Sequence, residues 1–100
     1  SSKSYNSVGF SVQDLSSSLA HKYGFNENEG GVVVTKVDPK SEAAEMGVRE
    51  GDLIQRVGSE NINSKKEFKK LVEESKEDGV VLLLIKREDI SRFYALDLRE

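Results

Sequence analysis

The sequence predicts an α+β fold, a small antiparallel β-barrel or sandwich of five to six strands capped by two to three helices. Short apolar runs recur along the 100 residues, and glycine-containing turns separate them. One longer segment, near residue 70, instead has apolar residues at helical spacing. No internal repeat or low-complexity linker divides the chain, so we expect a single domain.

The first strand is expected within residues 8–15, where apolar and polar side chains alternate. This period of two is typical of a half-buried strand. A short helix follows to about Tyr23, and either Asp14 or Ser16 can cap its N-terminus.

The middle of the chain predicts two strands with a short helix between them. The β-branched run Val32–Val37 forms one strand and the apolar run Leu53–Val57 the other. Ser41 is expected to cap the helix, and Gly47 to end it in the left-handed conformation that glycine adopts at least cost.

The longest helix is predicted after Ser64. In a capping box, the Ser64 hydroxyl accepts from the amide of Glu67, and the Glu67 carboxylate reaches back to the amide of Ser64. Phe68, Leu71 and Val72 then share one apolar face.

Two strands are expected at the C-terminal end. Val80–Lys86 is nearly continuously apolar, so we expect both of its faces to be covered. Arg92–Leu98 alternates, which predicts a strand with one buried face.

Composition excludes several function classes. The net charge is −3 with both signs interspersed, and no clustered basic surface indicates nucleic-acid binding. There is no cysteine, which excludes disulfides and cysteine metal ligands. No apolar run reaches the roughly 18 residues of a membrane span, so we expect no membrane insertion. The chain begins without methionine, and we expect a fragment of a longer protein.

No catalytic signature is visible. His21 is the single histidine, and a Ser-His-Asp triad would also need a nucleophile and an orienting acid beside it. No phosphate-binding, zinc-protease or calcium-binding motif occurs. We therefore expect no enzyme activity, no catalytic residue, no metal site and no cofactor, and an exposed helical position for His21.

Three motifs carry a resemblance to a known family. They are the loop Val8-Gly9-Phe10, the segment Ser-x-Ala-Ala-x-x-Gly-Val-x-x-Gly-Asp at 41–52, and the capped helix after Ser64. Together they resemble PDZ domains, and the strand order is most similar to that of bacterial HtrA/DegP serine proteases, whose closing strand comes last. The resemblance implies a flexible segment at 1–6, a domain at 7–98 and a tail at 99–100.

The resemblance also implies a peptide site between the first strand and the long helix. The carboxylate-binding loop would be Ser7, Val8, Gly9 and Phe10. The peptide-pairing strand would be Phe10, Ser11, Val12 and Gln13. The apolar pocket would be Val8, Phe10, Val12, Phe68, Leu71 and Val72. Lys65, at the start of the helix, would influence specificity. From the residues alone, the apolar positions are first of all core residues, and Lys65 is more simply interpreted as a solvated side chain.

The implied function is that of a peptide-binding module in an HtrA/DegP-like protease. It would bind C-terminal or exposed hydrophobic tails of substrate proteins by β-strand addition, either to recruit substrate or to regulate proteolysis. The parent protease domain and neighbouring subunits would be further partners, in the periplasm or envelope of a bacterium. Two alternatives stay open. One is a structural or oligomerisation role without peptide, and the other is a different parent, such as a tail-specific protease, a site-2 protease or a secretion component.

Overall fold

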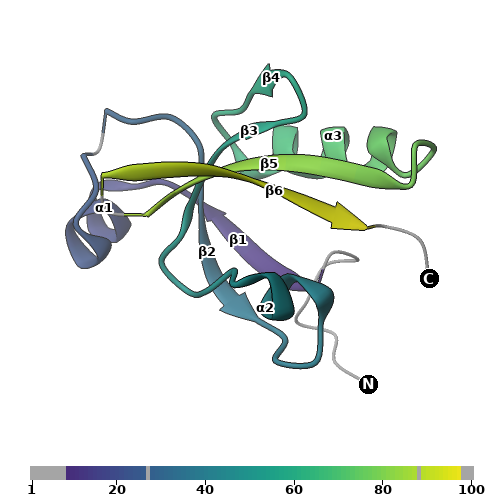
Figure 1. Ribbon diagram of the computed structural model, residues 1–100. Coiled ribbons are helices and arrows are strands. Elements are labelled where there is room, and N and C mark those ends of the chain that lie inside the picture. Colours follow the sequence, from purple (N-terminus) through teal and green to yellow (C-terminus); the bar gives the residue numbers. More distant parts are fainter. Residues whose placement is uncertain (1–8, 27, 88, 98–100) are drawn as a thin grey trace.

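A computed structural model describes residues 9–26, 28–87 and 89–97, which form six strands and three helices (Figure 1). The strands are β1 (Phe10–Asp14), β2 (Val32–Val37), β3 (Leu53–Val57), β4 (Glu60–Asn61), β5 (Val80–Arg87) and β6 (Ile90–Asp97). The helices are α1 (Ser17–Tyr23), α2 (Glu42–Met46) and α3 (Lys65–Ser75). The expected flexible segment 1–6, Ser7, Val8 and the expected tail 99–100 lie outside the described residues.

The strands form one antiparallel sheet in the order β1-β2-β3-β5-β6, with the short β4 paired to β3. Within the described residues the sheet is open, and β1 and the C-terminal strand β6 are its edges. The sheet is strongly twisted, so β1 and β2 cross β5 and β6 at a steep angle (Figure 1). The predicted α+β antiparallel fold with its last strand at the C-terminus is confirmed.

The core lies between the sheet and α3. Phe10 and Val12 of β1 are 0% and 1% exposed, which confirms the alternation predicted for this strand. Phe68 and Val72 of α3 pack against them in the same buried cluster. The rings of Phe10 and Phe68 are 5.9 Å apart between centroids and tilted by 50°. These contacts hold α3 against the first strand.

The short helices are capped as their sequences predict. The Ser16 hydroxyl accepts from the Leu19 amide at 3.2 Å, and the Ser41 hydroxyl accepts from the Ala44 amide at the same distance. Asp14, the alternative cap for α1, has another role. Its Oδ1 accepts from the backbone amide of Lys65 at 2.5 Å and thereby joins the end of β1 to the start of α3.

The N-terminus of α3 confirms half of the predicted capping box. The Ser64 hydroxyl accepts from the Glu67 amide at 3.2 Å, as expected. The Glu67 carboxylate, however, accepts from the amide of Asn63 at 2.8 Å and not from that of Ser64. The backbone is extended at Ser64, with φ −151° and ψ 159°, and this entry brings the preceding amide within reach of the carboxylate.

The expectation that both faces of β5 are covered is wrong. Its burial alternates along the strand, and Val80 and Leu82 are 44% and 46% exposed. The apolar residues of α3 join the core on one face of the sheet, and no described helix packs over the other face of β5. The outward side chains of β5 are therefore apolar without being buried.

A buried carboxylate joins the turn before β3 to the end of β5. Asp52 is 2% exposed and accepts from the Arg49 amide at 3.0 Å. It also accepts from Arg87 Nε at 2.8 Å and Arg87 Nη2 at 2.7 Å. Arg87 Nη2 donates in addition to the carbonyl of Gly47, just after α2, at 2.7 Å. The network thus connects three segments that are distant in the sequence.

Two more polar pairs hold the loops around α1. Lys86 donates to Glu29, and this hydrogen bond lowers the pKa of the Glu29 carboxyl. The Tyr23 hydroxyl donates to Glu50 at 2.7 Å, and the hydrogen bond raises the pKa of Tyr23.

Candidate functional site

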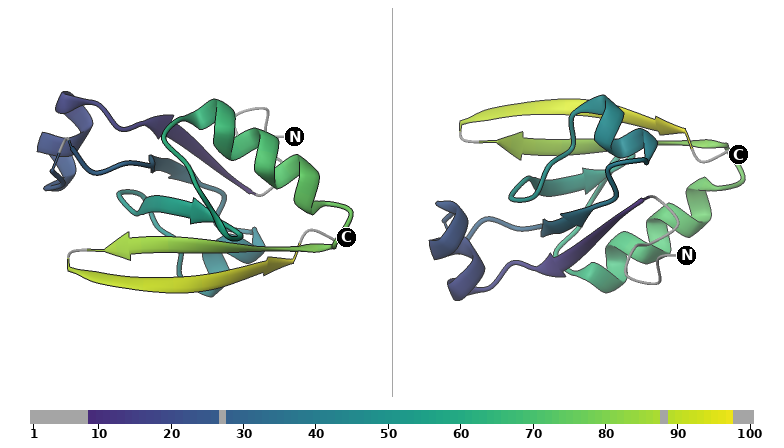
Figure 2. Two further views of the ribbon diagram at one scale, coloured as in Figure 1. Left: turned by 90° about the horizontal axis from the view of Figure 1, so that it is seen from above. Right: turned by 90° about the horizontal axis from the view of Figure 1, so that it is seen from below.

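The candidate site is the seam between β1 and α3, hereafter the β1–α3 seam. As an edge strand, β1 is paired with β2 along one side only. The helix α3 lies alongside β1 in both views of Figure 2. An edge strand of this kind offers backbone groups to which a further strand can be added.

Gly9, immediately before β1, has a backbone conformation that other residues rarely adopt. Its φ is +91°, in the left-handed region that favours glycine. A Cβ here would lie 2.4 Å from the Cβ of Ser41, and the Gly9 carbonyl accepts from the Asp38 amide at 2.8 Å. The backbone entering β1 is therefore held against the turn before α2, and only glycine fits this position.

The structure brings four of the predicted pocket residues together. Phe10, Val12, Phe68 and Val72 belong to one buried cluster and are at most 4% exposed. Of the predicted pairing residues, Ser11 is half-buried and Gln13 is exposed. Ser7 and Val8, which complete the predicted loop and pocket, lie outside the described residues.

Leu71 lies on a different flank of α3. It lines a hollow of about 220 Å³ together with Glu67 and with Glu60 and Asn61 of β4. With 3.6 residues per turn, the flank opposite Leu71 carries Lys69. Leu71 is therefore turned toward β4, and from this partly buried position it also packs against the edge of the core cluster that holds Phe68 and Val72.

The flank of α3 nearest β1 is basic. Lys65 begins the helix, and its backbone amide is bonded to the last residue of β1. Lys69 follows one turn later, and both lysines are exposed.

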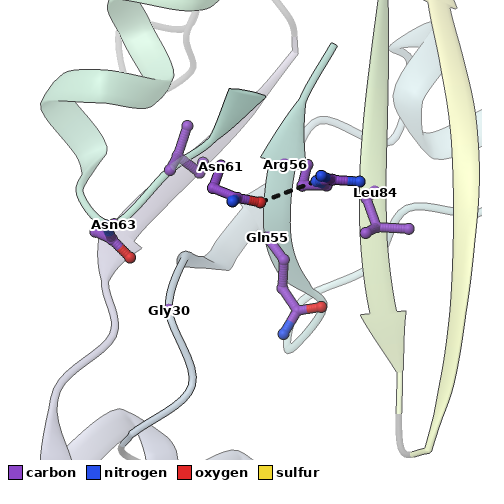
Figure 3. Close-up of a pocket in the computed structure, with 7 residues that line it drawn as sticks. Gly30, Gln55, Arg56, Asn61, Asn63 and Leu84 are labelled. Atoms are coloured by element: carbon purple, nitrogen blue, oxygen red, sulfur yellow. Dashed lines mark hydrogen bonds between the residues drawn. The ribbon is translucent and has the colours of Figure 1, made fainter. Parts of the chain in front are cut away.

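Sequence reasoning missed a second hollow, of about 430 Å³, on another part of the surface (Figure 3). Its polar lining is Gln55, Arg56, Asn61 and Asn63. These residue types are common on exposed strands and turns, and their convergence depends on an irregularity in β3 that no local pattern predicts.

The described residues contain no group of three histidine, cysteine, aspartate or glutamate side chains placed to hold a metal ion. His21 is exposed in the last turn of α1, as predicted. No helix in the described ranges combines the length and apolar character needed to cross a membrane.

Comparison with known families decides the assignment. The profile of the PDZ domain family matches residues 33–87, more than half of the chain. The chain belongs to the PDZ domain family. The predicted resemblance is thus confirmed, and the β1–α3 seam is the part of this PDZ domain that the resemblance singled out.

Sequence relatives of this PDZ domain are named as bacterial envelope proteases. A probable periplasmic serine endoprotease, DegP-like, from Brucella suis is 38% identical over 77 residues, which is 75% of this chain and 15% of that protein. The protein of the same name from Chlamydia pneumoniae is 31% identical over 93 residues, which is 93% of this chain and 19% of that protein. The chain therefore spans less than a fifth of the length of these relatives.

Solved structures share the fold. The HtrA3 PDZ domain bound to a phage-derived ligand (FGRWV) has a TM-score of 0.74 and 20% identity, and the match covers 89% of this chain and 80% of that one. The HtrA-type protease AlgW with decapeptide has a TM-score of 0.77 and 21% identity, over 90% of this chain and 27% of that one. These likenesses confirm the PDZ architecture.

Proposed function

We propose that this PDZ domain binds C-terminal or exposed hydrophobic tails of substrate proteins by adding them as a strand along β1. The observation that carries the proposal is the position of β1, at the edge of the sheet with α3 alongside it. In strand addition, backbone hydrogen bonds supply affinity, and alternate side chains supply specificity through the surfaces they meet. Phe10, Ser11, Val12 and Gln13 form the proposed pairing strand.

A terminal carboxylate would be held at the loop that begins β1. The positive φ of Gly9 supports this assignment, because successive amides around a left-handed residue can point into a small anion-binding concavity. Ser7 and Val8 complete the proposed loop. No arginine or lysine immediately precedes it, and Lys3 is the nearest, so backbone amides alone would hold the carboxylate.

The apolar side chain of the peptide would enter between β1 and α3, above Phe10, Val12, Phe68 and Val72. These residues are already packed, so we expect α3 to move slightly away from β1 when the side chain enters. That movement costs binding free energy, and we expect roughly micromolar affinity, or about −8 kcal/mol. Leu71 is left out of the proposed pocket because it faces β4.

The parent protein is proposed to be an HtrA/DegP-like serine endopeptidase of the bacterial periplasm or envelope. Relatives named as periplasmic serine endoproteases support this proposal. In such a parent, this domain would recruit substrate or regulate proteolysis while catalysis takes place elsewhere in the protein. The parent's protease domain and neighbouring subunits would be its other contacts.

Peptide titration followed by NMR tests the proposed function. The ¹⁵N-labelled domain is titrated with short peptides ending in Val, Ile, Leu or Phe, each with a free and an amidated C-terminus. We expect shifts confined to residues 8–13 and to the helix residues 67–75, and we expect amidation to abolish them. If no peptide shifts these residues, or if amidated peptides act equally well, the domain does not read a terminal carboxylate at β1 and the structural alternative gains support.

Lys65 is expected to set a preference for an acidic residue near the peptide C-terminus. A peptide with Asp two positions before its terminal Val should bind Lys65→Glu about three- to fivefold more weakly than the unchanged domain, because exposed ion pairs contribute up to about 1 kcal/mol. The matched control is Lys66→Glu, which makes the same charge change about 100° further around α3. Isothermal titration calorimetry at low and high salt measures the affinity of the peptide for each of the two variants. If both variants lose the same affinity, the effect comes from the net charge of the domain and not from the position of Lys65.

A further inference from the structure

One row of side chains crosses four strands on the face of the sheet that carries the exposed residues of β5. Asn61 of β4 is opposite Arg56 of β3, Arg56 is opposite Leu84 of β5, and Leu84 is opposite Phe93 of β6. Directly opposed residues in antiparallel strands project to the same face. The row therefore changes from polar at β4 to apolar at β6, where Phe93 is 58% exposed.

An irregularity in β3 adds a second polar side chain to this face. The pairing of β3 with β5 shifts between Ile54 and Arg56, so Gln55 is an extra residue in its strand. Bulges of this kind redirect side chains, often next to functional sites. Gln55 and Arg56 are adjacent in sequence, yet both line the same hollow (Figure 3).

The polar half of the surface is a hollow of about 430 Å³. It presents three carboxamides, from Gln55, Asn61 and Asn63, beside the guanidinium of Arg56. Arg56 Nε donates to Asn61 Oδ1 at 2.9 Å, which holds the guanidinium in place. Among the residues that the structure describes, no carboxylate lines the hollow and none is paired with Arg56. The site therefore offers a positive charge together with amide donors and acceptors.

The apolar half continues directly from the hollow. Leu84 lines the hollow and is also the cross-strand partner of Phe93. The next pair on the same face is Leu82 with Ala95, and Leu82 is 46% exposed. Large contiguous apolar surface beside a polar rim is typical of a place where another molecule binds.

We propose that this outer sheet face is a second polypeptide-binding surface, for an extended segment of another protein with a carboxylate followed three residues later by an aliphatic or aromatic side chain. The charge complementarity is between that carboxylate and Arg56. Phe93 lies two strands away, or about 10 Å. An extended segment in the polyproline II conformation covers this distance in about three residues and places side chains three residues apart on the same side. The carboxamides would serve the backbone groups of an extended segment, whereas a helix satisfies its own. The proposal does not depend on peptide binding at β1.

The probe is the peptide Ac-Ser-Glu-Ser-Ser-Leu-Ser-NH₂, whose blocked ends provide no terminal carboxylate for the β1–α3 seam. It is titrated into the ¹⁵N-labelled domain. We expect shifts at Gln55, Arg56, Asn61, Leu84 and Phe93, saturating with a dissociation constant of about 1 mM or below. We expect the peptide with Gln in place of Glu to bind at least about fivefold more weakly.

Matched variants distinguish peptide binding at this face from general effects of substitution on the domain. Arg56→Gln and Phe93→Ser should each raise the dissociation constant at least about fivefold, as expected for residues central to an interface. Arg92→Gln and Ile90→Ser are the controls, and should change it less than about twofold. They lie on the same hairpin but alternate to the other face, and Ile90 is 56% exposed against 58% for Phe93.

Three results would overturn the proposal: no shift at several millimolar peptide, shifts confined to β1 and α3, or equal losses in variants and controls. Shifts at Phe93 that depend on protein concentration without peptide would also overturn it, because the occupant would then be a second copy of the chain. None of these results bears on the titration with free C-termini.

Discussion

Replacing Gly31 with alanine is expected to destabilise the domain by about 3 kcal/mol or more, because a clash and an unfavourable backbone conformation combine. The added Cβ would lie 2.2 Å from the carbonyl oxygen of Ile54 and 3.2 Å from the Cα of Gln55. Both atoms belong to the backbone of β3, so no side-chain rotation relieves the overlap. Gly31 also has φ +115°, which L-residues rarely adopt. Urea unfolding followed by circular dichroism measures the loss.

Gly24→Ala is the matched control for the backbone term. Gly24 also has a positive φ, +80°, but nothing lies within 4 Å of a Cβ placed there. Its replacement should cost only the left-handed strain, about 1 kcal/mol. If the two variants lose equal stability, β3 can move away from Gly31, and the close approach of the two backbones does not restrict this position.

The features that the sequence predicted well are local ones. A serine cap acts on an amide three residues later, so Ser16, Ser41 and Ser64 could each be recognised without knowing the rest of the fold. The buried positions of β1 and α3 follow from periods of two and of 3.6 residues in the same way. Local periodicity was therefore enough to predict most elements and their buried positions.

The features that sequence analysis missed depend on partners far along the chain. The apolar run of β5 indicated burial on both faces, but burial also requires a covering element, and α3 covers one face only. The role of Asp52 could not be predicted from its own segment, because its partner Arg87 comes 35 residues later. The close approach of Gly31 to the backbone of Ile54 likewise involves a partner 23 residues later and leaves no local pattern around Gly31.

In the candidate site too, local features were predicted and features that depend on distant partners were missed. The resemblance to PDZ domains predicted the strand and the helix of the seam, but sequence could not give the rotation of α3. That rotation is visible only once β4 is in place. It buries Val72 in the core and leaves Leu71, its neighbour in the chain, partly buried at the edge of the core beside β4. The outer-face hollow was missed because the extra residue in β3 becomes apparent only in its pairing with β5.

Replacing Asp52 with alanine is expected to destabilise the domain by about 3 kcal/mol, within the range for breaking a buried charged pair. The variant leaves the Arg49 amide and the Arg87 guanidinium without their shared acceptor, and it removes the connection between the turn before β3 and the end of β5. The Arg87 side chain is 44% exposed, so water replaces part of its lost bonds, and we expect a loss below the upper end of that range. Chemical unfolding at neutral pH provides the measurement.

Two companion variants show whether the lost stability comes from the charge of Asp52, from its hydrogen bonds, or from removing an aspartate in general. Asp52→Asn keeps the shape and the acceptor oxygen while removing the charge, so we expect a loss of about 1–2 kcal/mol. Asp89→Ala removes an exposed aspartate near the start of β6 and should change stability by less than about 0.5 kcal/mol. If Asp52→Ala behaves like Asp89→Ala, the end of β5 is held by hydrophobic packing alone. A large loss in Asp52→Ala with a small one in Asp52→Asn would instead show that the hydrogen bonds of this carboxylate, more than its charge, join the two ends of the sheet.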